Sequence, residues 1–330
     1  MRQSSATVAL LASAVIGGLG LTPTAAHAQA GPPVARAAWI KSCTDKEDDS
    51  SPCGRWQVLL RDGGKVTVRG AATRTNGRGK RVSDPGAFAI SADGRVLAYE
   101  RAGDHRLVVR RLAGGKVTVL PRSAVPASVG TEGVGLTLSP AGDKVLIDFP
   151  AEARRPAKVI TIATGRTVTL PAQDSMVGFS GDGGEVLATR YLSDNTTRMT
   201  AYRLGGGSIK RTLPQVVANA AVTALAADGR TVAAFTPGDT EKGAPPRLRV
   251  HDLVTGELSA GVDLPVKAGV LVSAAWWTAG GQLGVAVQSD EEGEPAVVRV
   301  LTVDPGSGAA TRADSYTISK TRYAFITAGE

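Results

Sequence analysis

Two patterns of apolar and turn-forming residues alternate along most of the chain. In the first, two apolar runs flank a glycine-containing turn, and its copies cover residues 87–100, 136–149, 177–190, 222–235 and 274–287. In the second, a glycine turn precedes a run that often ends in Leu-Pro, and its copies cover residues 58–70, 109–121, 160–171, 202–214, 251–265 and 301–313. The runs are short and rich in Val, Leu, Ile and Thr, so both patterns predict β-hairpins.

The spacing of the second pattern indicates a repeat architecture. Its turn glycines stand at positions 64, 115, 165, 207, 256 and 306, with separations of 51, 50, 42, 49 and 50 residues. One period holds two hairpins, and therefore four strands, which is typical of a β-propeller blade. A blade covers only part of its apolar surface by itself, and its neighbours in the ring cover the rest.

The two ends of the sequence predict six blades. The second pattern occurs six times but the first only five times, and residues 322–329 have the character of the missing innermost strand. Residues 37–42 resemble the strand that follows it, so we expect the last strand to complete the first blade and close the ring, which removes open sheet edges. The predicted fold is an all-β, six-bladed propeller of four-stranded antiparallel blades, in one domain over residues 31–330.

Several repeats resemble known propeller motifs. ISADGRVLAY (90–99) and LSPAGDKVLI (138–147) look like the S-P-D-G-x-x-[IL]-A motif of TolB-type and WD40-like propellers. VHDLVTG (250–256) resembles the V-W-D-L-x-T-G strand end of WD40 repeats, with His251 in the place of the usual tryptophan. Since no Trp-Asp pair occurs, the TolB-like class fits better. The resemblance implies a platform for protein interaction or ligand binding, commonly periplasmic or extracellular.

Residues 1–30 have the pattern of a secretory signal peptide. Arg2 gives a positive start, residues 6–21 are uncharged and mostly apolar, and two Ala-x-Ala sequences follow at residues 26–30. A retained membrane anchor is the alternative, but this apolar run is shorter than the roughly 20 residues that a span needs. We expect cleavage to leave a secreted protein without a membrane span, extracellular or associated with the cell envelope.

The charge balance bears on the partner. The whole chain has a formal net charge of +8, and removal of Arg2 with the signal peptide leaves 37 basic and 30 acidic residues. A basic protein invites a nucleic-acid partner, but export argues against one. An unknown protein or an anionic polymer of the cell envelope is the expected partner, and the plainer alternative is that the basic residues only keep the surface soluble. We expect a monomer.

The two cysteines lie close together in one predicted loop. Cys43 and Cys53 enclose a polar segment, and nearby cysteines in an oxidising compartment usually pair. We therefore predict a disulfide that staples a surface loop. A redox role is not indicated, because the Cys-x-x-Cys spacing is missing.

In a propeller with this strand order, the long connections gather on one face. These are the loops between the second and third strands of a blade and the segments between blades, and variable loops on a rigid scaffold favour binding. One of them, residues 69–86, carries a basic set that is the candidate site for an anionic polymer: Arg69, Arg74, Arg78, Lys80 and Arg81. The alternative is a solvated, flexible loop.

Signals for catalysis or metal binding are weak. No Gly-x-Ser-x-Gly or His-Glu-x-x-His motif occurs, and the acidic stretches 45–49 and 290–294 lack the spacing of a calcium loop. The remaining candidates have structural alternatives: turn chemistry for Asp93, Asp182 and Asp228, a structural or solvated role for His105 and His251, and core packing or channel lining for Trp276 and Trp277.

The sequence therefore favours a non-catalytic binding scaffold without a cofactor. The alternative is a hydrolase or lyase centred in the channel of the ring. It requires three or more carboxylates, or carboxylates with a histidine, to converge at the channel mouth, whereas a lining of apolar and small residues would count against it.

Overall fold

The structure is a computed structural model that describes residues 31–44, 46, 49–77, 80–126, 129–150, 152, 155–289 and 294–330, with the backbone alone for residues 80–83. The predicted signal peptide lies outside the described residues. Within the described part, none of the helices has both the length and the apolar character that a membrane crossing requires.

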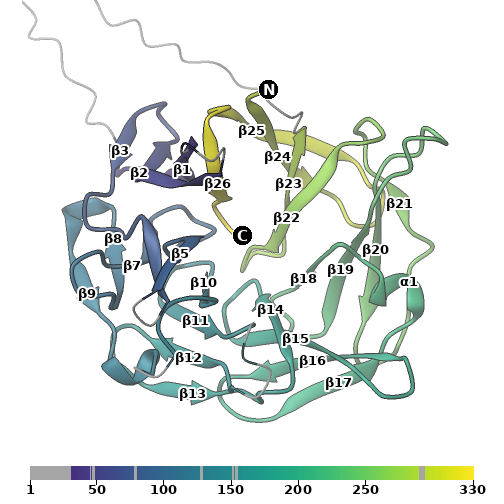
Figure 1. Cartoon of the computed structure of the whole chain (residues 1–330). Coiled ribbons are helices and arrows are strands. Elements are labelled where there is room, and N and C mark those ends of the chain that lie inside the picture. The colour runs from purple at the N-terminus through teal and green to yellow at the C-terminus, as the bar shows by residue number, and fades with distance from the viewer. Residues whose placement is uncertain are drawn as a thin grey trace, which may run out of the picture. The chain divides into compact units, whose positions relative to one another are not determined.

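Six four-stranded antiparallel sheets, the blades, form a ring within Pro32–Glu330 (Figure 1). We number the blades along the chain and name their strands from the innermost outward. Blade 1 is β26 (Arg322–Thr327), β1 (Ala35–Thr44), β2 (Ser50–Leu60) and β3 (Lys65–Thr67). Blade 2 is β6 (Phe88–Ile90), β7 (Val96–Glu100), β8 (Leu107–Arg111) and β9 (Val117–Val119). Blade 3 is β10 (Gly135–Leu138), β11 (Lys144–Asp148), β12 (Lys158–Thr161) and β13 (Thr167–Thr169).

The second half of the ring follows the same order. Blade 4 is β14 (Ser175–Phe179), β15 (Glu185–Tyr191), β16 (Thr197–Arg203) and β17 (Ser208–Thr212). Blade 5 is β18 (Val222–Leu225), β19 (Thr231–Thr236), β20 (Arg247–Asp252) and β21 (Val262–Asp263). Blade 6 is β22 (Leu271–Trp277), β23 (Leu283–Ser289), β24 (Ala296–Val303) and β25 (Ala310–Ile318). The predicted fold class is confirmed.

The last strand closes the ring as the sequence predicts. β26 pairs antiparallel with β1, with Ala38 opposite Ile326 and Trp39 opposite Phe325. Beyond the strand, the Ala328 amide donates to the Arg36 carbonyl oxygen at 2.8 Å. Blade 1 is thus assembled from both ends of the domain, and the edge of β1 that faces the channel is paired with β26 rather than open.

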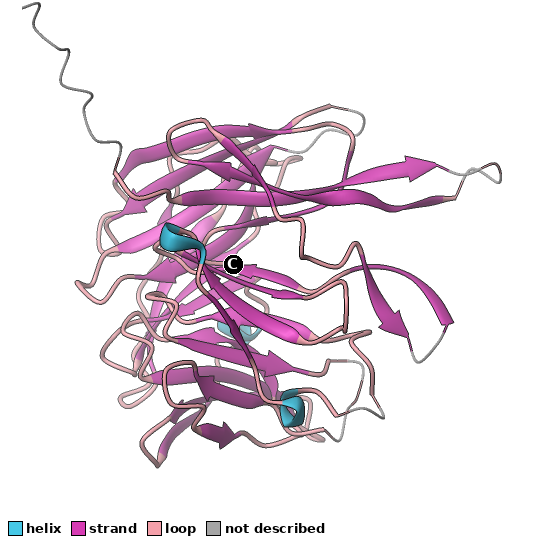
Figure 2. Ribbon diagram, turned by 90° about the vertical axis from the view of Figure 1, so that its left-hand side faces the viewer, coloured by secondary structure: helices cyan, strands magenta, loops and turns pink. Residues whose placement is uncertain are grey.

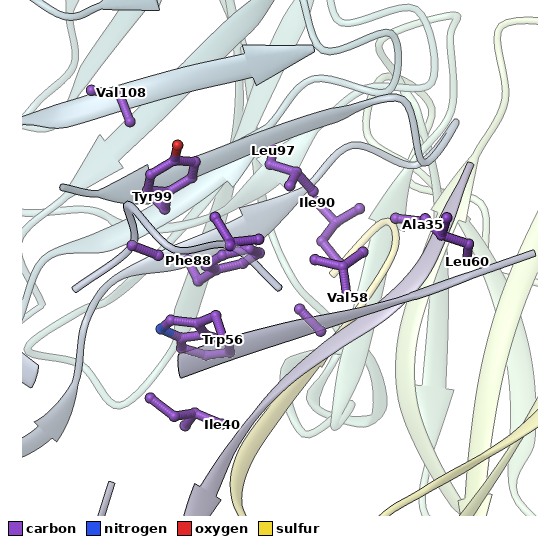
Figure 3. Close-up of a cluster of buried hydrophobic side chains, with 13 residues drawn as sticks. Ala35, Ile40, Trp56, Val58, Leu60, Phe88, Ile90, Leu97, Tyr99 and Val108 are labelled. Atoms are coloured by element: carbon purple, nitrogen blue, oxygen red, sulfur yellow. The ribbon is translucent and has the colours of Figure 1, made fainter. Parts of the chain in front are cut away.

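The hydrophobic core lies between the blades. Each of the six clusters of buried apolar residues is contributed by two neighbouring blades. Side chains alternate between the two faces of a strand, so in β7 Leu97 and Tyr99 pack toward blade 1, and Val96 and Ala98 pack toward blade 3. Figure 3 shows the cluster between blades 1 and 2, where Trp56 stacks on Phe88 with 4.5 Å between the ring centroids.

The turn carboxylates have the predicted structural role. Asp93 accepts hydrogen bonds from the Ser91 hydroxyl and the Arg95 amide. Asp182 does the same for the Ser180 hydroxyl and the Gly184 amide, and Asp228 accepts from the amides of residues 230 and 231. These side chains hold the tight turns between first and second strands and are committed to turn geometry.

Three elements lie between blades in the described part of the chain: a two-stranded hairpin of β4 (Arg74–Gly77) and β5 (Lys80–Pro85) after blade 1, a 3-10 turn at Arg122–Ala124 after blade 2, and α1 (Gln215–Ala218) after blade 4. A second 3-10 turn, Ala113–Gly115, lies within blade 2 between β8 and β9. In the side view of Figure 2, long hairpins project from one face of the ring. This is the face of the connections between second and third strands and between blades, which we call the loop face.

Candidate functional sites

The predicted disulfide is present on the loop face. Cys43 and Cys53 are bonded, with 5.8 Å between their Cα atoms, near the tip of the hairpin formed by β1 and β2. The bond joins β1 and β2 where they extend beyond the ring, so it keeps the two strands of this projecting hairpin together.

Part of the basic segment has regular secondary structure. Residues 74–77 and 80–85 pair as the β4–β5 hairpin. Arg69 is exposed, but Arg74 is partly buried and donates from Nε to the Pro52 carbonyl oxygen at 3.2 Å and from Nη2 to the Ser51 hydroxyl at 2.7 Å. These bonds hold the hairpin against β2, which gives Arg74 a structural role that the sequence did not reveal.

Two other members of the basic set lie at the start of β5. Lys80 and Arg81 belong to β5, and Arg78 lies outside the described residues. Binding of an anionic polymer by this set therefore stays a prediction.

A cavity of about 360 Å³ lies on the loop face between blades 4, 5 and 6; we call it the mouth cavity. Its walls come from the start of β18, from Ser273–Ala275 in the middle of β22, from the connection at residues 213–221 and from residues of blade 4 such as Thr189 and Met199. The lining is made of small, apolar and hydroxyl-bearing residues, such as Val177, Ala221, Thr223 and Ser273. Such a lining offers contact area and hydrogen-bonding groups but little charge.

A smaller cavity of about 50 Å³, the channel cavity, continues inward between the innermost strands of blades 3 to 6. Glu330 borders both cavities and is the one ionisable residue in their described linings. Its Oε2 accepts from the Thr327 amide at 2.8 Å and the Thr327 hydroxyl at 2.9 Å. The residue still reaches solvent, and the surrounding protein raises the pKa of its carboxyl by burial, against the lowering effect of the two hydrogen bonds.

The two adjacent tryptophans of β22 have different roles, as predicted. Trp277 is buried in the core between blades 5 and 6 and donates from Nε1 to the Ala224 carbonyl oxygen at 3.2 Å. Trp276 lines the channel cavity instead. The alternation of side chains along a strand separates the two neighbours.

A third cavity, of about 310 Å³, lies on the loop face beside blade 2, and we call it the lateral cavity. Next to it is a hydrogen-bonded chain that sequence reasoning missed. The Asn76 amide donates to the Thr131 hydroxyl at 2.7 Å, and that hydroxyl donates to Glu100 Oε1 at 2.7 Å. The His105 imidazole contacts the same Glu100 oxygen through Nδ1. Two connections thus meet at one carboxyl group, and Thr131 also links this group to the β4–β5 hairpin.

Glu100 is unusual within this chain of contacts. Its side chain is 0% exposed, and Oε2 has no hydrogen-bond partner in the described part of the chain. Burial raises the pKa of its carboxyl, while the contacts with His105 and Thr131 act in the opposite direction. The signal was present in the sequence, because Glu100 ends the otherwise apolar run VLAYE.

The histidines differ in environment. His251 is buried and its Nδ1 lies 3.0 Å from the Glu257 carbonyl oxygen, and burial lowers its pKa, so the structural interpretation of this residue fits. His105 is partly exposed, lines the lateral cavity and has a backbone φ of 55°. A left-handed conformation is uncommon for a residue other than glycine and costs on the order of 1 kcal/mol or more.

Metal ligands do not gather among the described residues, where no group of three or more His, Cys, Asp or Glu side chains is placed to hold an ion. Most of the acidic stretches 45–49 and 290–294 lies outside the described part of the chain.

Comparison with known proteins supports the fold. No family model and no curated protein matches this sequence. Among solved structures, TolB from Acinetobacter baumannii is similar with a TM-score of 0.50 and 17% identity, over 87% of this chain and 64% of that one. Putative TolB from Agrobacterium tumefaciens has a TM-score of 0.47 and 14% identity, over 87% and 91%. A chain of a nidogen/laminin complex has a TM-score of 0.48 and 12% identity, over 88% of this chain and 97% of that one.

The chain is a six-bladed propeller similar in structure to TolB-like propellers. At these identities the similarity shows the fold alone, and this chain spans less than two thirds of the Acinetobacter TolB chain. Propellers commonly serve as binding scaffolds, but the fold alone does not determine what is bound or where.

Proposed function

We propose that this protein is a secreted, non-catalytic binding module that holds a segment of a partner protein in the mouth cavity of its loop face. The observation that carries the proposal is the cavity itself. It has a volume of about 360 Å³, within the usual range for ligand pockets, and it is open to the face on which the long connections gather.

Exposed apolar side chains on the same face support a protein partner. Val177 lines the cavity and is 37% exposed, Leu271 begins β22 and is 54% exposed, and Tyr191 ends β15 and is 70% exposed. Large apolar and aromatic groups left in water around a hollow are typical of surfaces that bind another protein.

The composition of the lining supports binding over catalysis. The enzyme alternative needs several carboxylates, or carboxylates with a histidine, at the mouth, but the described linings of the mouth and channel cavities offer Glu330 alone. Small side chains and hydroxyl groups are suited to accommodating a chain segment, and they supply no general acid and base pair.

The test fills the cavity without disturbing the core. Ala221 lines the cavity and is exposed, so Ala221→Trp places a large ring in the cavity. Ala113→Trp is the matched control, because Ala113 is exposed in a turn between the third and fourth strands of blade 2, on the opposite face. The mature protein and both variants are used as bait against the culture supernatant and envelope fraction.

We expect one partner to be captured by the wild-type protein and by Ala113→Trp, and to be lost with Ala221→Trp. Equal capture by all three proteins would contradict docking at the mouth. Catalytic turnover by the purified protein, lost in the presence of a chelator, would contradict the non-catalytic assignment.

A further inference from the structure

We propose that the lateral cavity is a second binding site, separate from the mouth cavity, and that it takes an oxyanion, a phosphate or carboxylate group, between Arg106, Arg122 and His105. All three side chains belong to the described lining of this cavity. They come from two connections on the loop face: the turn between β7 and β8 and the segment between blades 2 and 3.

The charges around the cavity favour an anion. The acidic residue in the described lining is Asp104, and it is already paired with Arg101, whose Nε lies 2.8 Å from Asp104 Oδ1. This hydrogen bond lowers the pKa of Asp104 to about 2, so its charge is present and matched by that of Arg101. Glu100 faces His105 rather than an arginine. The charge of Arg106 also acts on Asp104, but neither Arg106 nor Arg122 forms an ion pair with an acidic side chain in the described part of the lining.

Two of the three donors, Arg106 and His105, are held in position, whereas the Arg122 side chain is exposed. Arg106 is half-buried and donates from Nη2 to the Leu120 carbonyl oxygen at 2.5 Å, which fixes its guanidinium group at the cavity wall. The Nε–H of Arg106 is buried without a partner among the described residues. A guanidinium group offers five N–H donors, and one bond to a carbonyl leaves others for a ligand.

His105 is fixed by the hydrogen-bonded chain on its other side. Glu100 contacts Nδ1, so the ring is oriented by a buried carboxyl that Thr131 holds in turn. The His105 side chain is 39% exposed and belongs to the lining of the cavity. The left-handed backbone of His105 is maintained at a cost in free energy, and such conformations are concentrated at binding and catalytic sites.

The size of the lateral cavity indicates how large the ligand is. A volume of about 310 Å³ exceeds that of a single phosphate ion, so there is room for a small organic body attached to the anionic group. Planar, bidentate donors such as guanidinium groups match both phosphate and carboxylate oxygens. A free metabolite and the end or repeat of an anionic polymer carry the same chemistry, and the experiment distinguishes them.

The test measures binding to the mature protein by calorimetry at fixed, low salt. The probes are inorganic phosphate, glycerol 3-phosphate and citrate, with glycerol as the neutral control and a polyphosphate chain as the polymer. We expect at least one oxyanion to bind and glycerol not to bind. Arg122→Gln and His105→Asn should each weaken the binding about tenfold or more. Asparagine tolerates the left-handed backbone, so the second variant keeps the fold.

Two controls separate the possible outcomes. Arg95→Gln removes the same charge from an exposed turn of blade 2 on the opposite face and should leave the affinity unchanged. Ala221→Trp should also leave it unchanged, since the mouth cavity is a different site. A polymer that binds more tightly than glycerol 3-phosphate, with the same dependence on Arg122 and His105, identifies a polymer as the source.

The proposal is overturned if the wild-type protein binds no oxyanion at millimolar concentration. It is also overturned if Arg122→Gln and His105→Asn bind as the wild type does, or if Arg95→Gln weakens binding equally, because the affinity would then reflect the net charge of the whole surface.

Discussion

Substitution of Trp56 tests whether the contacts between blades hold the ring together. Trp56 is 1% exposed and lies in the cluster that joins blades 1 and 2. Its ring stacks on Phe88 of the next blade, and its Nε1 donates to the Ala72 carbonyl oxygen at 3.1 Å, in the segment that links the two blades. One side chain therefore contributes packing and a buried hydrogen bond to the same junction.

The expected cost follows from these two contributions. Truncation of a fully buried tryptophan to alanine typically costs about 3–5 kcal/mol, through lost transfer free energy and the cavity left behind. Trp56→Phe keeps an aromatic ring against Phe88 but leaves the Ala72 carbonyl without its donor, which costs about 1–3 kcal/mol. We expect Trp56→Ala to lower the unfolding free energy by about 4 kcal/mol and Trp56→Phe to lower it by about half as much.

Urea unfolding followed by far-ultraviolet circular dichroism measures both changes. Val254→Ala is the control, because Val254 is 48% exposed in a turn of blade 5 and should change stability by no more than about 0.5 kcal/mol. A loss below about 2 kcal/mol for Trp56→Ala, with an unchanged denaturant slope, would refute the view that this cluster supports the ring. Equal losses for the alanine and phenylalanine variants would assign the whole effect to the hydrogen bond.

Three further predictions concern other parts of the domain. Replacing Cys43 and Cys53 by serine should lower the unfolding free energy by about 2.7 kcal/mol on the chain-entropy model, since the bond closes a short ring with a sequence separation of 10. The wild type with its disulfide reduced should have the same urea midpoint as this double variant. Because burial raises the pKa of Glu100 above its ordinary value of 4.5, the folded state retains a proton that the unfolded chain releases. The unfolding free energy of the wild type relative to that of Glu100→Gln should therefore fall as the pH rises from about 4.5 through the raised pKa. If the urea midpoints of the two proteins differ by the same amount at every pH, the prediction is contradicted. Gly94→Ala should destabilise the protein by about 2–4 kcal/mol in the same assay, because φ is +70° and a Cβ would lie 2.3 Å from a carbonyl oxygen of blade 1. Gly165 is the control: its φ is also +70°, but a Cβ there would meet no atom within 4 Å, so Gly165→Ala should cost about 1 kcal/mol.

The main features of the fold were open to prediction because they depend on local, periodic signals. Apolar alternation and glycine turns specify hairpins within a few residues of chain, and their spacing of about 50 residues specifies blades. The imbalance between six and five hairpins located the closing strand, which the pairing of β26 with β1 confirms. The roles of the turn aspartates followed in the same way, since an Asp before a turn glycine acts on its own neighbours.

The contacts that build the candidate sites join residues far apart in the sequence. Glu100 and Thr131 are 31 residues apart, and Arg74 lies more than 20 residues from the groups on β2 that it binds. The sequence by itself determined which segments are strands, how many blades they form and where the ring closes, because those properties belong to the repeat. Only the tertiary structure decided which side chains meet on the loop face, because adjacent blades bring together connections of irregular length that share no periodic pattern.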